Sequence, residues 1–276
     1  MKTAAFRFFF TIFLFIIGHW LFGSFSRLGK SSAYPSRSTS SVFAMAGTSP
    51  KPANPGHNDD TDQNSDTGQN NDTGHNKIKL PVPRCQGSIS VEEAIKLRRT
   101  RRSFLTAPLS KQQLSQILWA AMGITEEGGE KRSVPSAGAL NPLDIFIVVG
   151  KKGITQMEEG VYHYHPTDHQ LIRVGSRDLR KQIAEGALGQ SWISQTPVVI
   201  VITGEYVRTT RKYGERGIRY VHMEAGHVAQ NIFLQSVALE LGAGIVGAFD
   251  DEKIKSGMNL PDNYNPLLIM PVGKVK

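Results

Sequence analysis

Four arginines occur within five residues of the chain, in the segment Arg98-Arg99-Thr100-Arg101-Arg102. A helix C-terminus favours cations, so a solvated basic surface at the end of a helix is one interpretation of the segment. Four neighbouring guanidinium groups also repel one another unless an anion binds between them, and their planar geometry fits phosphate oxygens. A small phosphorylated ligand is therefore a second interpretation, and a nucleic-acid backbone is a third.

Small residues make up most of a second candidate segment, Pro135-Ser136-Ala137-Gly138-Ala139-Leu140-Asn141-Pro142. They would let the backbone come close to a ligand, and Ser136 and Asn141 supply hydrogen-bonding groups. A plain connecting loop explains the same composition. A glycine-rich stretch at 242–249 follows a predicted helix rather than a strand, so it lacks the context of a dinucleotide-binding fingerprint.

The histidines and the cysteine do not predict a metal site. His163 and His165 are two residues apart and would share one face of a strand, with His169 close in sequence. No carboxylate or cysteine lies at a spacing that would complete a coordination shell, so we expect no metal. Cys85 is the only cysteine, which excludes an internal disulfide.

Composition divides the chain into two parts. The 276 residues carry a formal net charge of +8, which permits an anionic partner without selecting one. Residues 1–84 hold 9 of the 32 Lys and Arg and 5 of the 24 Asp and Glu, a balance of +4. The remaining +4 belongs to residues 85–276, which are numerous enough for one domain with a real core.

The N-terminal part predicts location rather than chemistry. After Lys2 and Arg7, an apolar run extends over residues 8–22, close to the ~20 residues that span a bilayer core. A retained membrane anchor, a cleaved signal peptide and a buried helix are the three interpretations of residues 1–26. Residues 27–84 are rich in Ser, Asn, Asp, Gly and Pro and are predicted to be a disordered linker. These segments predict a membrane-anchored or exported protein.

Residues 85–276 contain the elements that must position the candidate side chains. Their patterns predict helices that begin near Ser90 and Ser110, a long helix over 218–241, strands over 145–149, 198–203 and 267–272, and a hairpin that turns at 166–168. Helices and strands are mixed but do not alternate regularly. This favours an α+β fold over a doubly wound parallel one.

Read together, eight motifs resemble the nitroreductase-like, FMN-dependent family, and in particular its SagB-type branch of azoline-forming dehydrogenases. Each motif is weak alone, but their order across residues 92–274 is specific. The resemblance covers the domain at 85–276 and none of the first 84 residues. The motifs are the two segments described above, together with Gly160–Pro166, Leu188–Trp192, Lys212–Gly217, Glu224–Asn231, Gly247–Asp251 and Pro271–Lys274.

The resemblance implies an α+β domain with a mostly antiparallel central sheet flanked by helices, an intertwined homodimer, and FMN bound at the dimer interface. Cations and small residues at matching positions would hold the flavin. The phosphate and ribityl chain would be bound by Arg98, Arg99, Thr100, Arg102, Gly273 and Lys274, and the ring by Pro135, Ser136, Ala137, Gly138, Asn141, Gly247 and Ala248.

The resemblance also implies an oxidoreductase that moves a hydride between a donor such as NAD(P)H and a small-molecule substrate through flavin N5, in ping-pong turnover. Lys212 and Tyr213 match a pair that azoline dehydrogenases use as acid/base groups. An exposed basic stretch is the alternative for this pair, because arginines surround it. A flavin-binding module without turnover, and a phosphate- or nucleic-acid-binding domain using the arginines, are the alternative functions. We expect no nucleic-acid partner.

Overall fold

A computed structural model describes residues 77–126, 128–129 and 131–276. Within these residues, seven strands form one sheet in the order β1-β4-β3-β2-β5-β7-β6. Every neighbouring pair is antiparallel, in agreement with the mostly antiparallel sheet that the family resemblance implies. The strands are β1 (Lys77–Lys79), β2 (Leu143–Val149), β3 (Gly160–His165), β4 (Gln170–Gly175), β5 (Val198–Gly204), β6 (Leu241–Ala243) and β7 (Asn265–Lys274).

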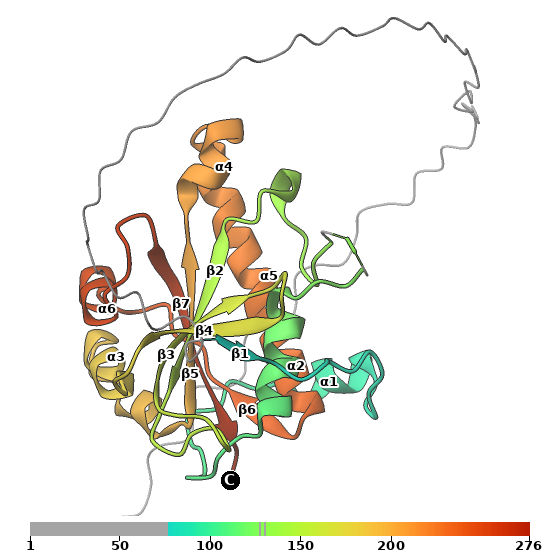
Figure 1. The fold of residues 1–276 in the computed structure, drawn as a ribbon, viewed down its shortest axis with the longest axis vertical. Helices are drawn as coiled ribbons and strands as arrows, with labels where there is room; N and C mark the ends of the chain where they lie inside the picture. The colour runs from blue at the N-terminus through green and yellow to red at the C-terminus, as the bar shows by residue number, and fades with distance from the viewer. Residues whose placement is uncertain (1–76, 127, 130) are drawn as a thin grey trace, which may run out of the picture. The chain divides into compact units, whose positions relative to one another are not determined.

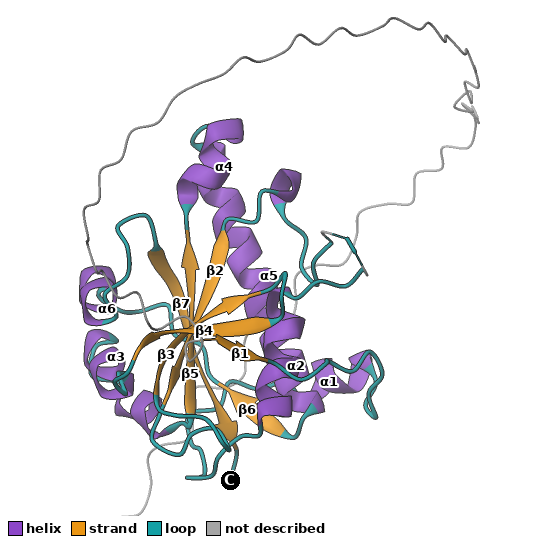
Figure 2. Ribbon diagram, viewed as in Figure 1, coloured by secondary structure: helices purple, strands orange, loops and turns teal. Residues whose placement is uncertain are grey.

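Helices cover both faces of the sheet, so the α+β prediction is confirmed (Figures 1 and 2). One face packs against α2 (Lys111–Met122) and α5 (Arg216–Ala238), and the other against α3 (Arg180–Gly186) and α6 (Asp251–Gly257). The other described helices are α1 (Val91–Leu97), α4 (Tyr206–Tyr213) and the short 3-10 helices η1 (Ala137–Ala139) and η2 (Ser191–Gln195).

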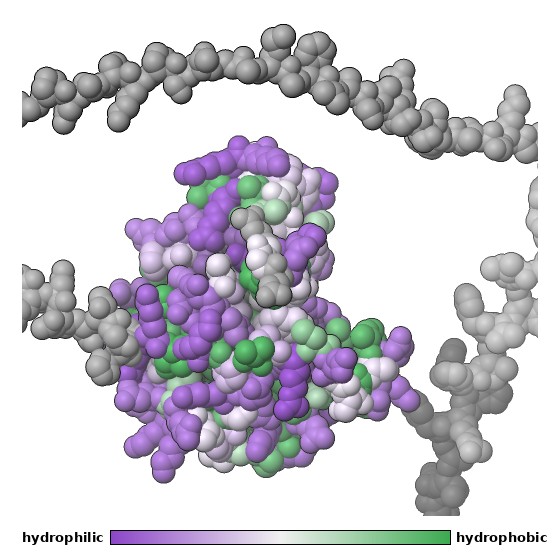
Figure 3. Space-filling model, turned by 45° about the vertical axis from the view of Figure 1, so that its right-hand side comes forward, coloured by the Kyte–Doolittle hydropathy of each residue, from purple (hydrophilic) through white to green (hydrophobic). Residues whose placement is uncertain are grey.

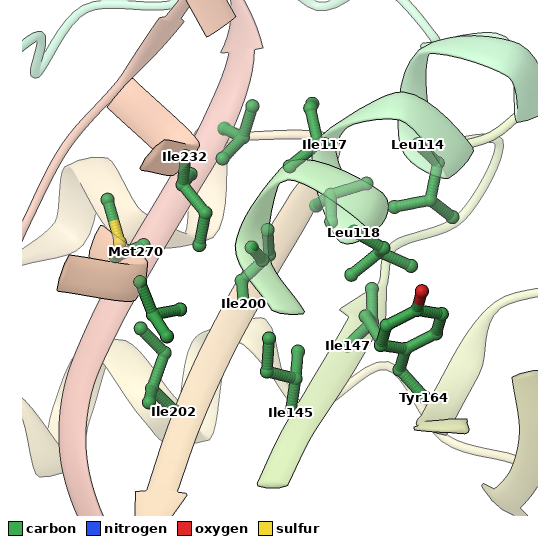
Figure 4. Packing of buried hydrophobic residues seen from close by; sticks show 14 of the residues in the cluster. Leu114, Ile117, Leu118, Ile145, Ile147, Tyr164, Ile200, Ile202, Ile232 and Met270 are labelled. Carbon is green, nitrogen blue, oxygen red and sulfur yellow. The ribbon is translucent and has the colours of Figure 1, made fainter. Parts of the chain in front are cut away.

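Successive side chains of a strand point to opposite faces of the sheet, which explains why the domain has a hydrophobic core on each face. Ile145 and Ile147 of β2 point to the α2–α5 side, whereas Phe146 lies in the core on the α3–α6 side. Figure 4 shows the first of these cores, in which Ile117 of α2 and Ile232 of α5 lie over the strands. β2 and β5 are buried on both faces, which accounts for their almost continuous apolar sequence.

Side-chain caps fix where two helices begin. The Ser90 hydroxyl accepts a hydrogen bond from the Glu93 amide at the start of α1. Ser110 and Gln113 form a reciprocal capping box at the start of α2. The long helix differs from its predicted end, because α5 stops at Ala238 and residues 241–243 pair with β7 instead.

The folded domain begins before residue 84, where the predicted linker ends. β1 lies within the range 27–84 and pairs with β4, and Leu80 is only 3% exposed. The buried Ser115 hydroxyl donates to the Pro81 carbonyl, and His169 contacts both of these groups. The chain from Lys77 is therefore part of the sheet, and the three-part division of the chain remains a prediction.

The predicted membrane-anchored or exported location requires correction. Within residues 77–126, 128–129 and 131–276, no helix has the length and apolar character needed to cross a bilayer. The longest helix there, α5, carries Arg216, Arg219 and the buried Glu224. The apolar run at 8–22, on which the expectation rested, lies outside the described residues.

Candidate functional site

The arginine segment lies against the β6–β7 edge of the sheet. Thr100 forms a parallel bridge with Ala243, and the Arg101 amide donates to the Ala243 carbonyl at 2.9 Å. Ala243 belongs to β6, whose Gly242 pairs with Gly273. The structure therefore brings together two predicted phosphate-binding segments that are about 170 residues apart in sequence. We call this group the basic edge; it consists of Arg98, Arg99, Thr100, Arg102, Gly273 and Lys274.

Within the described part of the chain, the cations of the basic edge have no acidic partners. Among the described residues, none of its arginines nor Lys274 forms an ion pair with a carboxylate. Arg98 lies over the Phe233 ring at 5.3 Å, and Arg102 over the Trp192 ring at 5.9 Å. Aromatic faces hold these guanidinium groups without neutralising them. The basic edge is thus suited to an anion.

Gly247 and Ala248 lie further along the same edge. Val246 forms a bridge with Ile269 of β7. On β7, Ile269 lies three residues before Val272, which pairs with Ala243 of β6. At ~3.3 Å per strand residue, this is about 10 Å from the basic edge. Both residues are exposed, and a Cβ added to Gly247 would meet only Leu268, at 3.8 Å. Packing within the chain does not require glycine there, so the position is open to a ligand.

The segment Ser136–Asn141, which we call the Ser136 loop, has a strained backbone. Gly138, Ala139 and Asn141 have φ values of 62°, 55° and 46°. Such angles are unfavourable for residues with a Cβ and persist only where the surroundings impose them. The Ser136 hydroxyl accepts a hydrogen bond from the Asn141 amide at 2.9 Å, which closes the loop.

Helix α4 lies beside this loop and carries both predicted acid/base residues. A Cβ on Gly138 would be 2.7 Å from the Tyr213 hydroxyl and 3.0 Å from Lys212 Nζ. The Tyr213 ring also packs edge-on against Tyr220 of α5, with centroids 5.2 Å apart. The structure therefore brings Lys212 and Tyr213 to the Ser136 loop. The surface at the top of Figure 3, where α4 lies, is mostly hydrophilic.

An ion-pair network that sequence reasoning missed joins α4 to the loop. Arg208 donates to the Asn141 carbonyl at 3.1 Å and pairs with Asp144 at 2.8 Å and Glu205 at 2.5 Å. Burial disfavours charge on Arg208, but the two carboxylates outweigh it and hold the pKa of Arg208 above its ordinary value. His163 adds a contact to Asp144 at 3.0 Å. In the sequence, Arg208 is one of the arginines that surround Lys212 and Tyr213, so an exposed basic stretch explains it as well.

Glu224 is the second residue that sequence reasoning missed. It lies on the buried side of α5, and its Oε2 atom has no hydrogen-bond partner among the described residues. Burial raises the pKa of Glu224, although the neighbouring Ser136 hydroxyl and the Arg132 charge offset part of the increase. The available signal in the sequence was that Glu224, a charged residue, interrupts the apolar face of the predicted long helix.

The two groups of predicted residues lie at opposite ends of the sheet. Leu143, just after the Ser136 loop, pairs with Gly204 at one end of β2, and Val149 pairs with Val198 at the other. The basic edge lies beyond the second end, where Val198 also pairs with Val272. Six strand residues at ~3.3 Å each separate the ends by about 20 Å. One chain does not bring all the predicted flavin contacts together.

Gly138 provides a direct test of the contact between the loop and α4. We expect Gly138→Ala to destabilise the protein by about 1–2 kcal/mol, because a Cβ is unfavourable at this φ and would displace Tyr213. Gly226→Ala is the control, since a Cβ there meets nothing within 4 Å and alanine favours helix. Denaturant unfolding of both variants measures the difference. Equal stabilities would rule out the close contact.

Comparison with known proteins gives consistent results. A family model described as "Nitroreductase family" matches residues 95–274. A Methanocaldococcus jannaschii protein described as a nitroreductase is 45% identical over 186 residues, which cover 67% of this chain and 91% of that protein. The microcin B17-processing protein McbC of Escherichia coli is 26% identical over 60% of this chain and 63% of its own length.

A solved structure agrees with these matches. The crystal structure of a Ralstonia eutropha protein described as a nitroreductase superposes with a TM-score of 0.65 at 26% identity, covering 74% of this chain and 92% of that one. The sequence and structure matches together confirm the resemblance to the nitroreductase-like family and its SagB-type branch that the ordered motifs indicated.

Proposed function

Because the chain belongs to the nitroreductase family and is thus an oxidoreductase, we propose that it uses FMN to move a hydride between a donor such as NAD(P)H and a small-molecule substrate. The observation that carries this proposal is the basic edge, whose cations have no carboxylate partners in the described part of the chain. The planar fork of an arginine matches the oxygens of a phosphate group.

The described residues fit an FMN molecule lying along the β6–β7 edge. Arg98, Arg99, Thr100 and Arg102, with Gly273 and Lys274, would hold its phosphate and ribityl chain. The exposed Gly247 and Ala248, about 10 Å further along β7, would lie against its ring. When bound, FMN would supply hydride acceptance and donation at N5.

We propose that the rest of the ring site comes from a second copy of the chain. Pro135, Ser136, Ala137, Gly138 and Asn141 lie about 20 Å along the strands from the basic edge of their own protomer, so one chain holds the two halves of the predicted site far apart. In a homodimer, the Ser136 loop of one protomer can lie over the basic edge of its partner. Each of the two sites would then be shared between protomers.

Within such a site, α4 would supply the proton chemistry. Lys212 and Tyr213 are positioned together by their contact with Gly138 and by the packing of Tyr213 on Tyr220. A lysine and a tyrosine can each donate or accept a proton beside a reacting carbon or nitrogen, which supports an acid/base role for the pair. Because Lys212 is exposed, it can exchange that proton with solvent between turnovers.

Steady-state kinetics of the full chain loaded with FMN test this function. With NADH or NADPH as donor and a quinone or nitroaromatic compound as acceptor, we expect donor oxidation and parallel double-reciprocal lines, as ping-pong turnover requires. FMN binding without oxidation of any donor would instead support the flavin-binding module without turnover. A protein that binds nucleic acid with a steep salt dependence but no FMN would support the third function.

A further inference from the structure

One half-buried arginine of α4 contacts both the Ser136 loop and the strand that follows it. The Arg208 guanidinium group donates a hydrogen bond to the Asn141 carbonyl at 3.1 Å. It also forms ion pairs with Asp144 of β2, at 2.8 Å, and with Glu205, just before α4, at 2.5 Å. A guanidinium group presents several donors in one plane, so the Arg208 side chain can fix the loop, the strand and the helix relative to one another.

The start of α4 is joined to the end of the loop at two consecutive residues. The Glu205 amide donates to the Pro142 carbonyl at 2.8 Å, next to the bond between Arg208 and Asn141. The Oδ2 atom of Asp144 is buried and accepts no hydrogen bond from the described residues, so the Arg208 charge is what compensates it. The charge of Arg208 is thus required where the loop, β2 and α4 meet.

The backbone of Asn141 shows why the loop needs this contact. Asn141 has a φ of 46°, which is unfavourable for a residue with a Cβ and persists only where the surroundings impose it. Its amide donates to the Ser136 hydroxyl at 2.9 Å, and its carbonyl accepts from Arg208. Ser136 belongs to the loop itself, whereas Arg208 supports this conformation from outside the loop.

The same face of α4 carries the predicted acid/base lysine one turn further on. Arg208 and Lys212 are four residues apart, so their side chains lie on one face of the helix, about 6 Å apart along its axis. The loop follows this face in the opposite direction, because Arg208 contacts Asn141, three residues after Gly138. Lys212 Nζ and the Tyr213 hydroxyl lie 3.0 and 2.7 Å from a Cβ placed on Gly138. The Arg208 contact therefore sets which part of the loop faces the acid/base pair.

We propose that Arg208 is a positioning residue, which holds α4 against the Ser136 loop so that Lys212 and Tyr213 are presented together to the substrate. This inference rests on the proposed function, since it takes that pair as the acid/base groups. Arg208 acts on the reaction only through these two side chains, and its own charge is balanced by Asp144 and Glu205.

Turnover of the full chain at saturating FMN tests whether Arg208 acts through the pair. Arg208→Ala should lower kcat roughly 10- to 100-fold, the cost of a small misplacement of reacting groups. In a chain that already carries Lys212→Ala and Tyr213→Phe, the same substitution should cost less than about twofold, because the groups that it positions are gone. A purely structural role would lower the rate by the same factor in both backgrounds.

Two further variants guard against a general loss of structure. Arg208→Lys keeps the charge between Asp144 and Glu205 but can satisfy fewer partners at a time, so its turnover rate should lie between those of the wild type and Arg208→Ala. If Arg208→Ala does not fold, the comparison of the two backgrounds is made with Arg208→Lys. Arg211→Ala is the matched control, since it removes the same charge from an exposed position of α4 and should leave kcat unchanged.

Hydrogen exchange of the protein without FMN gives a readout besides activity. Arg208→Ala should speed the exchange of the Asn141 amide and of the α4 amides about tenfold, because a hydrogen bond between the loop and the helix is lost. Arg211→Ala should leave these exchange rates unchanged.

The outcomes separate the positioning role from the proposed function. With an active wild-type protein, an unchanged kcat in Arg208→Ala, or equal losses in both backgrounds, would overturn the positioning role alone. Unchanged hydrogen exchange would overturn it as well. A wild-type protein that neither binds FMN nor oxidises a donor would overturn the proposed function, and with it the reaction that Arg208 serves, even if faster exchange supported its hold on the loop.

Discussion

Arg102→Ala is expected to weaken FMN binding by roughly 10- to 100-fold, because it removes a charge-assisted contact to phosphate worth about 1.5–3 kcal/mol. Arg102 is exposed, and its guanidinium group lies over Trp192 without a carboxylate partner in the described residues. Its charge is therefore available to an anion. Titration of the full chain with FMN, followed by flavin fluorescence, measures the change.

The neighbouring Arg101 is the matched control for this prediction. It has the same charge and is also exposed, but its backbone amide bonds to Ala243 and its side chain packs against Gly242. Arg101→Ala should reduce the affinity for FMN less than threefold, because water and salt screen the charge of an exposed side chain that makes no direct contact with the phosphate. Equal losses in the two variants would mean that general positive charge, and not a defined phosphate site, attracts the flavin.

Loss of Lys212 or Tyr213 is expected to lower the turnover rate by roughly 10²- to 10⁴-fold, the range of general acid–base catalysis. Lys212→Ala and Tyr213→Phe should retain most FMN affinity, because the phosphate contacts lie at the other end of the sheet. Arg211→Ala is the control, since Arg211 is exposed on the same helix and carries the same charge. If Arg211→Ala lost as much activity as Lys212→Ala, the basic stretch would be an electrostatic surface without a specific proton donor.

Mixing two variants, at an FMN concentration too low to load Arg102→Ala, tests whether the site is shared between protomers. In a dimer of one Arg102→Ala chain and one Lys212→Ala chain, a shared arrangement leaves one site with both defects and one site with neither. Exchange of subunits should therefore restore roughly a quarter of wild-type activity, since about half of the dimers are mixed. If each protomer held a complete site, mixing would restore no activity.

The secondary structure was largely predictable, because local patterns decide it. The Ser90 and Ser110 caps and the β-branched run of β5 act over a few residues, so the sequence shows them directly. Alternation also placed His163 and His165 correctly on one face, with ring centroids 4.9 Å apart. In contrast, β1 has only three residues, and its pairing with β4 depends on a contact about 90 positions away.

The candidate site was only partly predictable. The basic edge and the Ser136 loop were visible as unusual residue types at close spacing. Glu224 and Arg208 were not identified, because the burial of Glu224 and the contacts of Arg208 with Asn141 and Asp144 arise only in the folded chain. In the sequence, Glu224 lies within an amphipathic helix and Arg208 within a basic stretch, and both patterns are common in proteins without a functional role.

The central claim, that this chain binds FMN for redox chemistry, is tested most directly by anaerobic titration of the full chain with FMN, followed by addition of NADH or NADPH. We expect saturable binding with one FMN per chain and bleaching of the flavin absorbance when the donor is added. Failure to take up FMN at any concentration, with the protein folded, would contradict the account.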